Sequence, residues 1–452
     1  MRFDAILIGA GQANPPLARA LVARGQKIAL VEEHLLGGSC VNYGCTPSKT
    51  LIGSAHALHA ARRGAEFGFH ADNIRVDFDR VMQRQRDAVL TSRGGMEKRY
   101  GHMEGLTLIR AHAEFEAPHV IRAGDQVLEA ERIYLDVGAR PNSPDIPGLS
   151  AIPYLTHITL LDLTELPRHL IIVGGGYVGI EYAQVFRRFG SEVTVIQSGP
   201  QILPREDADI AAALTKVLKA EGIRILLNAQ VTSFEPRGAD VLARVEGHGG
   251  ISGSHVLLAV GVQPNSDRLG LDRAGIAVDD HGFIQVDDYL QTTAPGVYAL
   301  GDVIGHGLFT HTSYNDYQII AANLDAPTRK LSDRIPTYGV YTDPPLGRVG
   351  LSENEVKASG KRALKATLPM TSVARAREFG QTAGFIKVLI DAETEQILGA
   401  AVLGLTGDEV IQTFTMAMIA KAPYTTIRDA MFIHPTVNEL LPSLLEEVEP
   451  LM

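Results

Sequence analysis

The chain has 452 residues, 45% of them apolar and 21% charged, and a net charge of -10, as expected for a globular protein with several cores. No basic block suggests binding to nucleic acid or to an anionic membrane. We see neither a signal peptide near the start nor an apolar run of membrane-spanning length, so we expect a cytoplasmic protein with no membrane or nucleic-acid partner.

The first predicted unit is FDAILIGAGQANPPLARALVARGQKIALVEEH, which indicates strand, turn, helix and strand. A strand over residues 3–8 leads into a turn with Gly9 and Gly11, which lets the backbone approach a diphosphate at the start of the helix. Glu32 ends the second strand, where a carboxylate binds ribose hydroxyls. Asn14 stands where the fingerprint has its third glycine, which permits close packing of helix on strand, so we expect weaker packing there.

The next segment, GGSCVNYGCTPSKT, holds Cys40 and Cys45, the only cysteines of the chain. In a reducing compartment, such a pair is more often catalytic or metal-binding than structural. A zinc site completed by His56 and His59 is one alternative, and two inert buried thiols are another. Residues five apart lie about 140° apart on a regular helix, so a disulfide between them requires an irregular turn, for which Gly44 is suited.

A second unit, HLIIVGGGYVGIEYAQVFRRFGSEVTVIQSG, carries the complete fingerprint Gly174, Gly176 and Gly179. We expect strands over residues 170–173 and 193–196, and a helix over residues 177–189 that Gly190 closes. Two such units predict two dinucleotide sites. The alternative is two doubly wound domains without ligands.

The second unit offers no carboxylate at the end of its second strand, where Gln197 stands. A carboxylate there binds the ribose 2′-hydroxyl and repels a 2′-phosphate. Arg187, Arg188 and Arg205 are candidates to approach that position. We therefore expect NADPH to be used at least as well as NADH.

Further motifs carry a family resemblance that covers essentially the whole chain. They are GGSCVNYGCTPSK, with Ser39 where threonine is usual, YALGDVIG at 298–305, HPTVNEL at 434–440, and the linkers DVGARPN and AVGVQPN. The chain thereby resembles the class I pyridine nucleotide-disulfide oxidoreductases, the family of dihydrolipoamide dehydrogenase, glutathione reductase and mercuric reductase.

The resemblance implies that electrons pass from NAD(P)H through FAD to a Cys40–Cys45 disulfide and on to a disulfide substrate, or in reverse from a dithiol. It implies that Cys45 lies beside the flavin, that Cys40 attacks the substrate, and that Lys49 near the flavin pairs with Glu181. It also implies an acid–base pair of His434 and Glu439. The FAD contacts implied are Gly9, Gly11, Glu32, Gly38, Ser39, Lys49, Gly138, Gly301 and Asp302, and those to the nicotinamide dinucleotide are Gly174, Gly176, Gly179, Gln197 and Gly261. No metal site is implied.

The fold implied is α/β, with two Rossmann-like dinucleotide-binding domains and an α+β C-terminal dimerisation domain. The expected divisions are 1–147 for the first part of the FAD domain, 148–266 for the NAD(P) domain, 267–335 for the second FAD part and 336–452 for the interface domain. In the family, the histidine motif reaches the cysteines of the other subunit, so the resemblance implies a homodimer with shared active sites.

GAGQANPPLA, FTHTSYNDYQII and TDPPLGRVG look like the mercuric-reductase-like branch, but the C-terminal cysteine pair of true mercuric reductases is absent. Three hypotheses remain open. The chain is a disulfide reductase or dithiol dehydrogenase, an NAD(P)H-dependent reductase of mercuric or copper ions or quinones, or a flavoprotein that senses without turnover. The sequence does not identify the electron acceptor.

Overall fold

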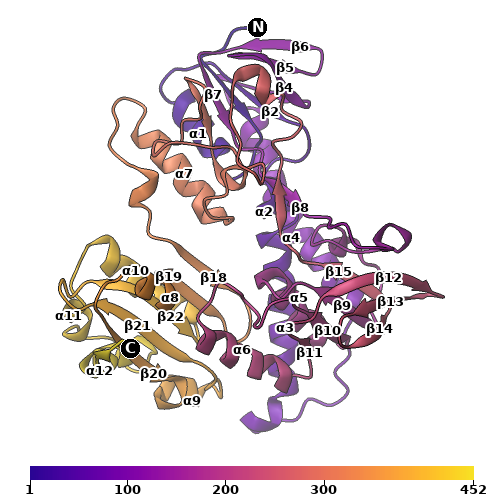
Figure 1. The fold of residues 1–452 in the computed structure, drawn as a ribbon, viewed down its shortest axis with the longest axis vertical. Coiled ribbons are helices and arrows are strands. Elements are labelled where there is room, and N and C mark those ends of the chain that lie inside the picture. Colours follow the sequence, from indigo (N-terminus) through magenta and orange to yellow (C-terminus); the bar gives the residue numbers. More distant parts are fainter. Residues whose placement is uncertain (452) are drawn as a thin grey trace.

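The computed structural model describes residues 1–451, and its N-terminal region is built on a five-stranded parallel sheet in the order β17-β7-β1-β2-β3 (Figure 1). Strands β1 and β2 are buried along their whole length, as in parallel sheets covered on both faces. Helices α1 and α7 lie beside this sheet, and an antiparallel sheet, β4-β5-β6, lies at the N-terminal end of the molecule. The strands are β1 (Ala5–Ile8), β2 (Ile28–Glu32), β3 (Leu106–Arg110), β7 (Arg132–Leu135), β17 (Val297–Ala299), β4 (Ala113–Ala117), β5 (Val120–Ala123) and β6 (Gln126–Glu129).

The middle region repeats this plan with a four-stranded parallel sheet, β11-β10-β9-β15, and a second antiparallel sheet, β12-β13-β14. A short antiparallel pair, β8 with β16, links the two nucleotide-binding regions. The strands are β9 (His169–Val173), β10 (Glu192–Ile196), β11 (Arg224–Leu226), β15 (His255–Leu258), β12 (Val231–Arg237), β13 (Asp240–Val245), β14 (Gly249–Gly253), β8 (Ala139–Pro141) and β16 (Val262–Pro264).

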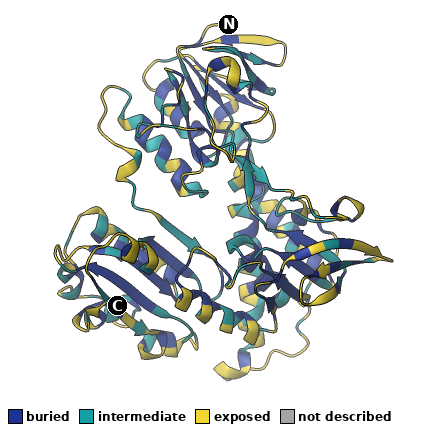
Figure 2. Cartoon of the chain, viewed as in Figure 1, coloured by how far each residue is buried: buried dark blue, intermediate teal, exposed yellow. Residues whose placement is uncertain are grey.

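The C-terminal region is a six-stranded antiparallel sheet in the order β18-β19-β22-β21-β20-β23. Its central strands form a buried interior, while the outer faces of its helices are exposed (Figure 2). The strands are β18 (Thr337–Val340), β19 (Leu346–Gly350), β20 (Ala363–Pro369), β21 (Phe385–Asp391), β22 (Ile397–Leu403) and β23 (Glu449–Pro450).

Helices α3 and α4 extend from the first region to the second, and α3 packs against α5. One hydrophobic core contains Leu51 of α3 together with Ile180 of α5 and Leu403 of the C-terminal sheet, so the three regions share buried contacts. The helices are α1 (Asn14–Val22), α2 (Gly38–Asn42), α3 (Cys45–Arg62), α4 (Phe78–Gly101), α5 (Tyr177–Phe189), α6 (Ala208–Ala220), α7 (Thr310–Ala322), α8 (Glu353–Ala358), α9 (Ala374–Glu378), α10 (Gly407–Ile419), α11 (Thr425–Arg428) and α12 (Leu441–Glu446).

The register of the two parallel sheets places the fingerprint residues at one edge of each. Ile8 lies opposite Val31 and Leu135, so the residues that follow them, among them Gly9, emerge together. In the second sheet Val173 lies opposite Ile196 and Leu258 in the same arrangement. This edge, at the carboxyl ends of the strands, is where doubly wound sheets bind nucleotides.

The predicted fold class is confirmed. Helix α5 has the predicted bounds, whereas β1 begins at Ala5 instead of residue 3, because residues 3 and 4 do not pair with a neighbouring strand in the main sheet. Among residues 1–451, no helix combines the length and apolarity that crossing a membrane requires.

Candidate functional site

The two cysteines lie on either side of a helix break. Cys40 belongs to the short helix α2, and Cys45 is the first residue of α3. Between them, Gly44 takes a backbone conformation outside the helical region, with φ -115° and ψ -109°. A Cβ atom at Gly44 would lie 3.1 Å from the Ser39 carbonyl oxygen. The irregular turn expected from the spacing is therefore present, and both thiols are free.

The two thiols differ in their tendency to ionise. A hydrogen bond with the Cys40 thiol is the main cause that lowers the pKa of Cys45, to about 6, and the Thr310 hydroxyl and the Lys49 charge act in the same direction. The Thr310 Oγ1 atom lies 3.1 Å from the Cys45 Sγ atom. The pKa of Cys40 is raised, because its thiol donates to Cys45 and is partly buried. Because only a thiolate is a strong nucleophile, the pair holds one reactive sulfur near neutral pH.

A buried carboxylate joins three regions of the chain beside the cysteines. The Lys49 Nζ atom lies 2.7 Å from the Glu181 Oε2 atom, with 34% of the Lys49 side chain and 5% of the Glu181 side chain exposed. The Tyr341 backbone N–H donates to the Glu181 Oε1 atom at 2.8 Å. The Lys49 ammonium also lies 4.7 Å above the centre of the Tyr341 ring. Both residues predicted for this pair therefore meet.

The first glycine of each fingerprint is required by close backbone contact. Gly9 has φ +86°, and a Cβ atom there would lie 2.2 Å from the Asp136 carbonyl oxygen. Gly174 has φ +107°, and a Cβ atom there would lie 2.3 Å from the Ala259 carbonyl oxygen. No other residue fits either position without displacing the backbone.

Glu32 and Gln197 hold equivalent positions in the two units. The Ala10 N–H donates to the Glu32 Oε2 atom at 2.7 Å, and the Gly175 N–H donates to the Gln197 Oε1 atom at 2.8 Å. Each side chain thus fixes the glycine turn and lies at the edge where a ribose binds. The two units differ there by one formal charge.

Asn14 fills the place of the third glycine instead of weakening the packing. Its Nδ2 atom donates to the carbonyl oxygens of Ile8, Gly9 and Tyr134 at 3.1, 2.9 and 3.3 Å. In the second unit, a Cβ atom at Gly179 would lie 2.2 Å from the Gly174 carbonyl oxygen. The helix and strand of the first unit are therefore far enough apart to hold an amide side chain, whose hydrogen bonds compensate for the lost close packing. The helix and strand of the second unit are not.

The remaining residues predicted for FAD surround the same edge. Gly38 packs on Gly11, since a Cβ atom at Gly38 would lie 2.9 Å from the Gly11 Cα atom. Ser39 is exposed, and Asp302 follows Gly301, which has φ +73°. Burial raises the pKa of Asp302 to about 6.

The glycines beside the turns leave room for dinucleotides. A Cβ atom at Gly138, Gly176 or Gly261 would meet no protein atom within 4 Å. At the second unit, this open space and the free N–H groups at the start of α5 fit a diphosphate. At the first unit, the Ala13 and Asn14 N–H groups at the start of α1 already donate to Asp136, and the open space beside the glycine turn is what fits a diphosphate. The residues present therefore suit FAD in the first unit and a nicotinamide dinucleotide in the second.

His434 and Glu439 form the predicted pair, away from the cysteines of the same chain. The His434 Nδ1 atom lies 2.6 Å from the Glu439 Oε2 atom, and 78% of the His434 side chain is exposed against 15% of that of Glu439. Helices α11 and α12, which flank the pair in sequence, lie in the C-terminal region, far from α2 (Figure 1). The exposed imidazole is therefore oriented, and within the described residues 1–451 the segment that carries it lies far from the helix of Cys40.

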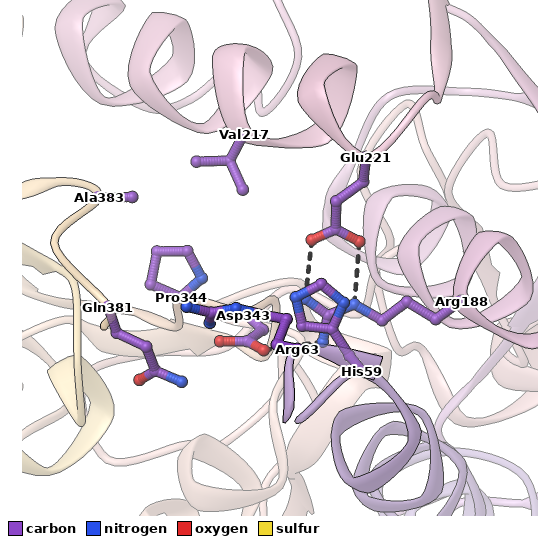
Figure 3. Close-up of a pocket in the computed structure, with 9 residues that line it drawn as sticks. All are labelled: His59, Arg63, Arg188, Val217, Glu221, Asp343, Pro344, Gln381 and Ala383. Carbon is purple, nitrogen blue, oxygen red and sulfur yellow. Dashed lines mark hydrogen bonds and ion pairs between the residues drawn. The ribbon is translucent and has the colours of Figure 1, made fainter. Parts of the chain in front are cut away.

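Two arginines expected near the nicotinamide ribose lie elsewhere. Arg188 is 5% exposed and binds Glu221 and Asp343, as the dashed lines to Glu221 in Figure 3 show. Arg187 donates to the backbone carbonyl of Glu221. Of the three candidates, only Arg205 is exposed and free of such contacts within residues 1–451.

The zinc alternative with His56 and His59 is also excluded by position. Both histidines lie on α3. The backbone of His56 is about 16 Å along the helix from that of Cys45, too far for both side chains to bind one zinc ion. The His56 Nδ1 atom lies 3.1 Å from the Asp343 Oδ2 atom. His59 lines a cavity of about 120 Å³ next to Arg188 (Figure 3).

Sequence reasoning missed Thr310, Tyr341 and the role of Asp136. Thr310 lies within FTHTSYNDYQII and Tyr341 directly before TDPPLGRVG, so both adjoin motifs that served only to mark a branch of the family. Asp136 begins the linker DVGARPN.

Comparison with known proteins gives a consistent result. The family described as pyridine nucleotide-disulphide oxidoreductase matches residues 3–320, and its dimerisation domain matches residues 336–444. The chain is 36% identical to the probable pyridine nucleotide-disulfide oxidoreductase RclA of Escherichia coli, over 99% of this chain and 100% of that protein. It is 32% identical to a mercuric reductase of Bacillus cereus, over 97% of this chain and 70% of that protein. It is also 32% identical to a dihydrolipoyl dehydrogenase of Thermus scotoductus, over 99% of this chain and 97% of that protein.

A solved structure agrees with these sequence matches. The Cu(II) complex of the HOCl-induced flavoprotein disulfide reductase RclA from Escherichia coli superposes with a TM-score of 0.91 at 35% identity, covering 99% of both chains.

Proposed function

The chain belongs to the pyridine nucleotide-disulphide oxidoreductase family, and on that premise we propose that Cys40 and Cys45 reduce a disulfide substrate with electrons from NAD(P)H that arrive through FAD. Family members are FAD-dependent flavoproteins with NAD(P)H as electron donor, and this chain is an oxidoreductase of that kind. The observation that carries the proposal is the helix break that brings one low-pKa thiol beside a second thiol.

The chemistry of the pair follows from thiol–disulfide exchange. Cys40, whose pKa is raised, first gives its proton to a base. The Cys40 thiolate so formed attacks one sulfur of the substrate, forms a mixed disulfide and expels the first thiolate product. The Cys45 thiolate then attacks the Cys40 sulfur, closes the Cys40–Cys45 disulfide and expels the second thiolate product. FAD held by the first unit would supply two electrons from NAD(P)H, which together with two protons would return the Cys40–Cys45 disulfide to the dithiol. Each thiolate product takes up one proton.

In this proposal His434 is the base that takes the Cys40 proton and the acid that protonates the thiolate products. Glu439 holds the Nδ1 side of the ring at 2.6 Å, which leaves Nε2 to exchange protons with a thiol. Because His434 is exposed and far from the cysteines of its own chain, the proposal requires the ring to serve the cysteines of a second subunit.

A homodimer with shared active sites is therefore part of the proposal. Large apolar side chains are exposed near His434 in sequence, with Met431 99% and Ile433 79% exposed. On α10, Met416 is 62% and Ile419 59% exposed. Apolar surface of this kind is typical of a subunit interface, and it supports dimerisation through the C-terminal sheet region.

Three finer assignments accompany it. We keep the divisions 1–147, 148–266, 267–335 and 336–452, which agree with the membership of the sheets, since β17 returns to the first sheet. NADPH is used at least as well as NADH, since the uncharged Gln197 does not repel a 2′-phosphate. The enzyme works in the cytoplasm, where thiols stay reduced.

The first experiment is turnover with NADPH against a panel of low-molecular-weight and protein disulfides, with Cu(II), Hg(II) and quinones as competing acceptors. Cu(II) belongs in the panel because the Escherichia coli relative was solved as a Cu(II) complex. The proposal expects the best disulfide to turn over faster than any metal ion or quinone. The reverse order would favour a metal-ion or quinone reductase.

The second experiment substitutes His434→Gln. Positioned acid–base catalysis is worth about 10²–10⁴-fold, so disulfide turnover should fall by that factor, while reduction of the flavin by NADPH stays near normal. Glu439→Gln should have a milder effect, because it only orients the ring. Both variants are first shown by light scattering to keep the oligomeric state of the parent. A loss below about threefold in a variant with that unchanged state would make the motif structural.

A further inference from the structure

A buried carboxyl group shares the helix terminus that binds the FAD diphosphate. Asp136 follows β7 directly and is 5% exposed. Its Oδ2 atom accepts hydrogen bonds from the backbone N–H groups of Ala13 and Asn14, both at 3.0 Å. These N–H groups belong to the start of α1, where the first unit receives the negative diphosphate.

The carboxyl group also fills the space beneath both FAD motifs. A Cβ atom at Gly11 would lie 2.8 Å from each carboxyl oxygen of Asp136. A Cβ atom at Gly301 would lie 2.8 Å from its Oδ1 atom. Asp136 is therefore packed between the first glycine turn and the turn that carries Asp302, and a side chain at Gly11 or Gly301 would collide with its carboxyl group.

The second unit shows what the same position looks like without a carboxyl group. Gly9 approaches the backbone oxygen of Asp136 as Gly174 approaches that of Ala259, so the two residues are equivalent. In the second unit, the equivalent side chain is the methyl group of Ala259, and a Cβ atom at Gly179 of α5 would lie 3.3 Å from it. Of these two termini, only that of α1 has a carboxyl group beside it.

The charged side chains that act on Asp136 are other carboxyl groups. Burial is the main cause that raises the pKa of Asp136, and the charges of Asp302 and of Asp316 on α7 act in the same direction. Arg334 neutralises Asp316, and Glu32 of β2 binds the N–H of Ala10. Among residues 1–451, no basic side chain forms an ion pair with Asp136, so its ionised form depends on the helix N–H groups alone.

We propose that FAD binding is coupled to protonation of Asp136, so that one proton is taken up for each FAD bound. Two anions at one helix terminus repel each other in a site shielded from water. The diphosphate diester of FAD stays ionised at neutral pH, so the carboxyl group is the partner that gains the proton. The proposal rests on the FAD dependence of the family and not on the identity of the electron acceptor.

The sign of the pH effect follows from linkage. If binding takes up one proton, FAD affinity falls by up to about tenfold for each pH unit over the range in which Asp136 is ionised before FAD binds. Raising the pH therefore releases FAD, and lowering it retains FAD.

The test uses the holoenzyme and needs no acceptor. Diluted enzyme is equilibrated between about pH 6 and pH 9, and released FAD is measured by its fluorescence. A pH-indicator dye in weakly buffered solution counts the protons released with it. The parent enzyme should lose FAD progressively as the pH rises and release about one proton for each FAD.

Asp136→Asn is the informative variant, because it keeps the shape of the group and removes its charge. It should bind FAD with no pH dependence over this range and release no proton, and at the upper end it should retain FAD better than the parent. Asp125→Asn, which changes an exposed carboxylate in the turn between β5 and β6, is the matched control and should behave like the parent.

Equal pH slopes in the parent and Asp136→Asn would overturn the proposal. So would a parent enzyme that releases FAD without protons, a result that stands even if the variant fails to fold. A preparation that binds no FAD at all would instead contradict the family assignment of the cofactor, and an enzyme that binds FAD but reduces no disulfide would contradict only the proposed substrate.

Discussion

The two nucleotide-binding units of this protein have the same backbone arrangement at their glycine turns but differ in the charge of the side chains around them. Each has a glycine turn packed against the residue that follows a strand, Asp136 after β7 or Ala259 after β15. Each also fixes the next N–H group with a side chain, Glu32 or Gln197. The first unit adds the carboxyl groups of Glu32 and Asp136, and the second has neutral residues at both places.

This difference separates two kinds of constraint. The turns are set by steric contact, which is the same for any dinucleotide, so their glycines recur. The side chains around them set which ligand is held and under what conditions, so they diverge. We therefore expect exchanges between the units to be severe where sterics decide and graded where charge decides.

The severest exchange is Gly179→Asn, which gives the second unit the residue of the first. The Cβ atom would lie 2.2 Å from a backbone oxygen, so the helix must move away from the strand, at a cost of about 3 kcal/mol or more. We expect NADPH binding, measured by calorimetry, to weaken by at least about 100-fold and the unfolding midpoint to fall. FAD content should stay near that of the parent.

Gly176→Ala is the control for that exchange, since its Cβ atom meets no protein atom within 4 Å. It should leave the unfolding midpoint unchanged and affect only NADPH affinity, because the nucleotide needs that space. Parent-like stability and NADPH affinity in Gly179→Asn would show that the second unit can adopt the spacing of the first.

The reverse exchange, Asn14→Gly, should be milder. It removes the amide that donates to three backbone carbonyls, and unsatisfied buried polar groups cost about 1–3 kcal/mol. We expect urea denaturation to show a loss of that size, together with faster release of FAD on dilution. A variant at least as stable as the parent would mean that the amide only fills space.

Gln197→Glu gives the second unit the charge of the first. A carboxylate accepts the Gly175 N–H as the amide oxygen does, so the turn should persist. The new charge should repel a 2′-phosphate and shift the ratio of kcat/KM values toward NADH by about tenfold, which is 1.4 kcal/mol. Gln197→Ala removes the side chain without adding charge, so it should shift this ratio less. If both variants shift the ratio equally, the effect comes from losing the contact with the Gly175 N–H and not from the charge.

The sequence predicts the features that depend on neighbouring residues and misses those that depend on contacts between distant residues. The glycine turns, α5 and the break between Cys40 and Cys45 were predictable because they depend on residues close together in the chain. Thr310 contacts Cys45 across 265 residues, and Tyr341 contacts Glu181 across 160. No local pattern encodes such contacts.

The arginines illustrate the same limit. Arg187 and Arg188 lie on the helix that begins at the nicotinamide fingerprint, but they turn toward Glu221, which follows α6 in the sequence. Asn14 was misjudged because the fingerprint describes a spacing between helix and strand that this unit does not have. In both cases the residue type was clear from the sequence and its surroundings were not.

The smallest expected effect concerns the contact that joins the two units, between Lys49 of the first and Glu181 of the second. The Lys49 charge lowers the pKa of Cys45, but less than the Cys40 and Thr310 hydrogen bonds do. Lys49→Met should therefore raise the pKa of Cys45 above about 6 by no more than about one unit. Because a raised pKa leaves less thiolate at a given pH, reduced enzyme should react more slowly with iodoacetamide at Cys45 near pH 6, and the two rates should converge well above both pKa values. Mass spectrometry of the labelled peptide across a pH series gives the titration directly.

Lys49→Met also leaves the Glu181 carboxylate without its cation, so that it keeps only the Tyr341 N–H. The double variant Lys49→Met with Glu181→Gln separates the two effects, since it removes both charges of the pair. If the double variant restores the parent titration, the repulsion by the stranded carboxylate is responsible. If it retains a raised pKa, the direct effect of the ammonium is responsible, and an unchanged pKa in Lys49→Met alone would show that the two units are electrostatically independent at the thiol pair.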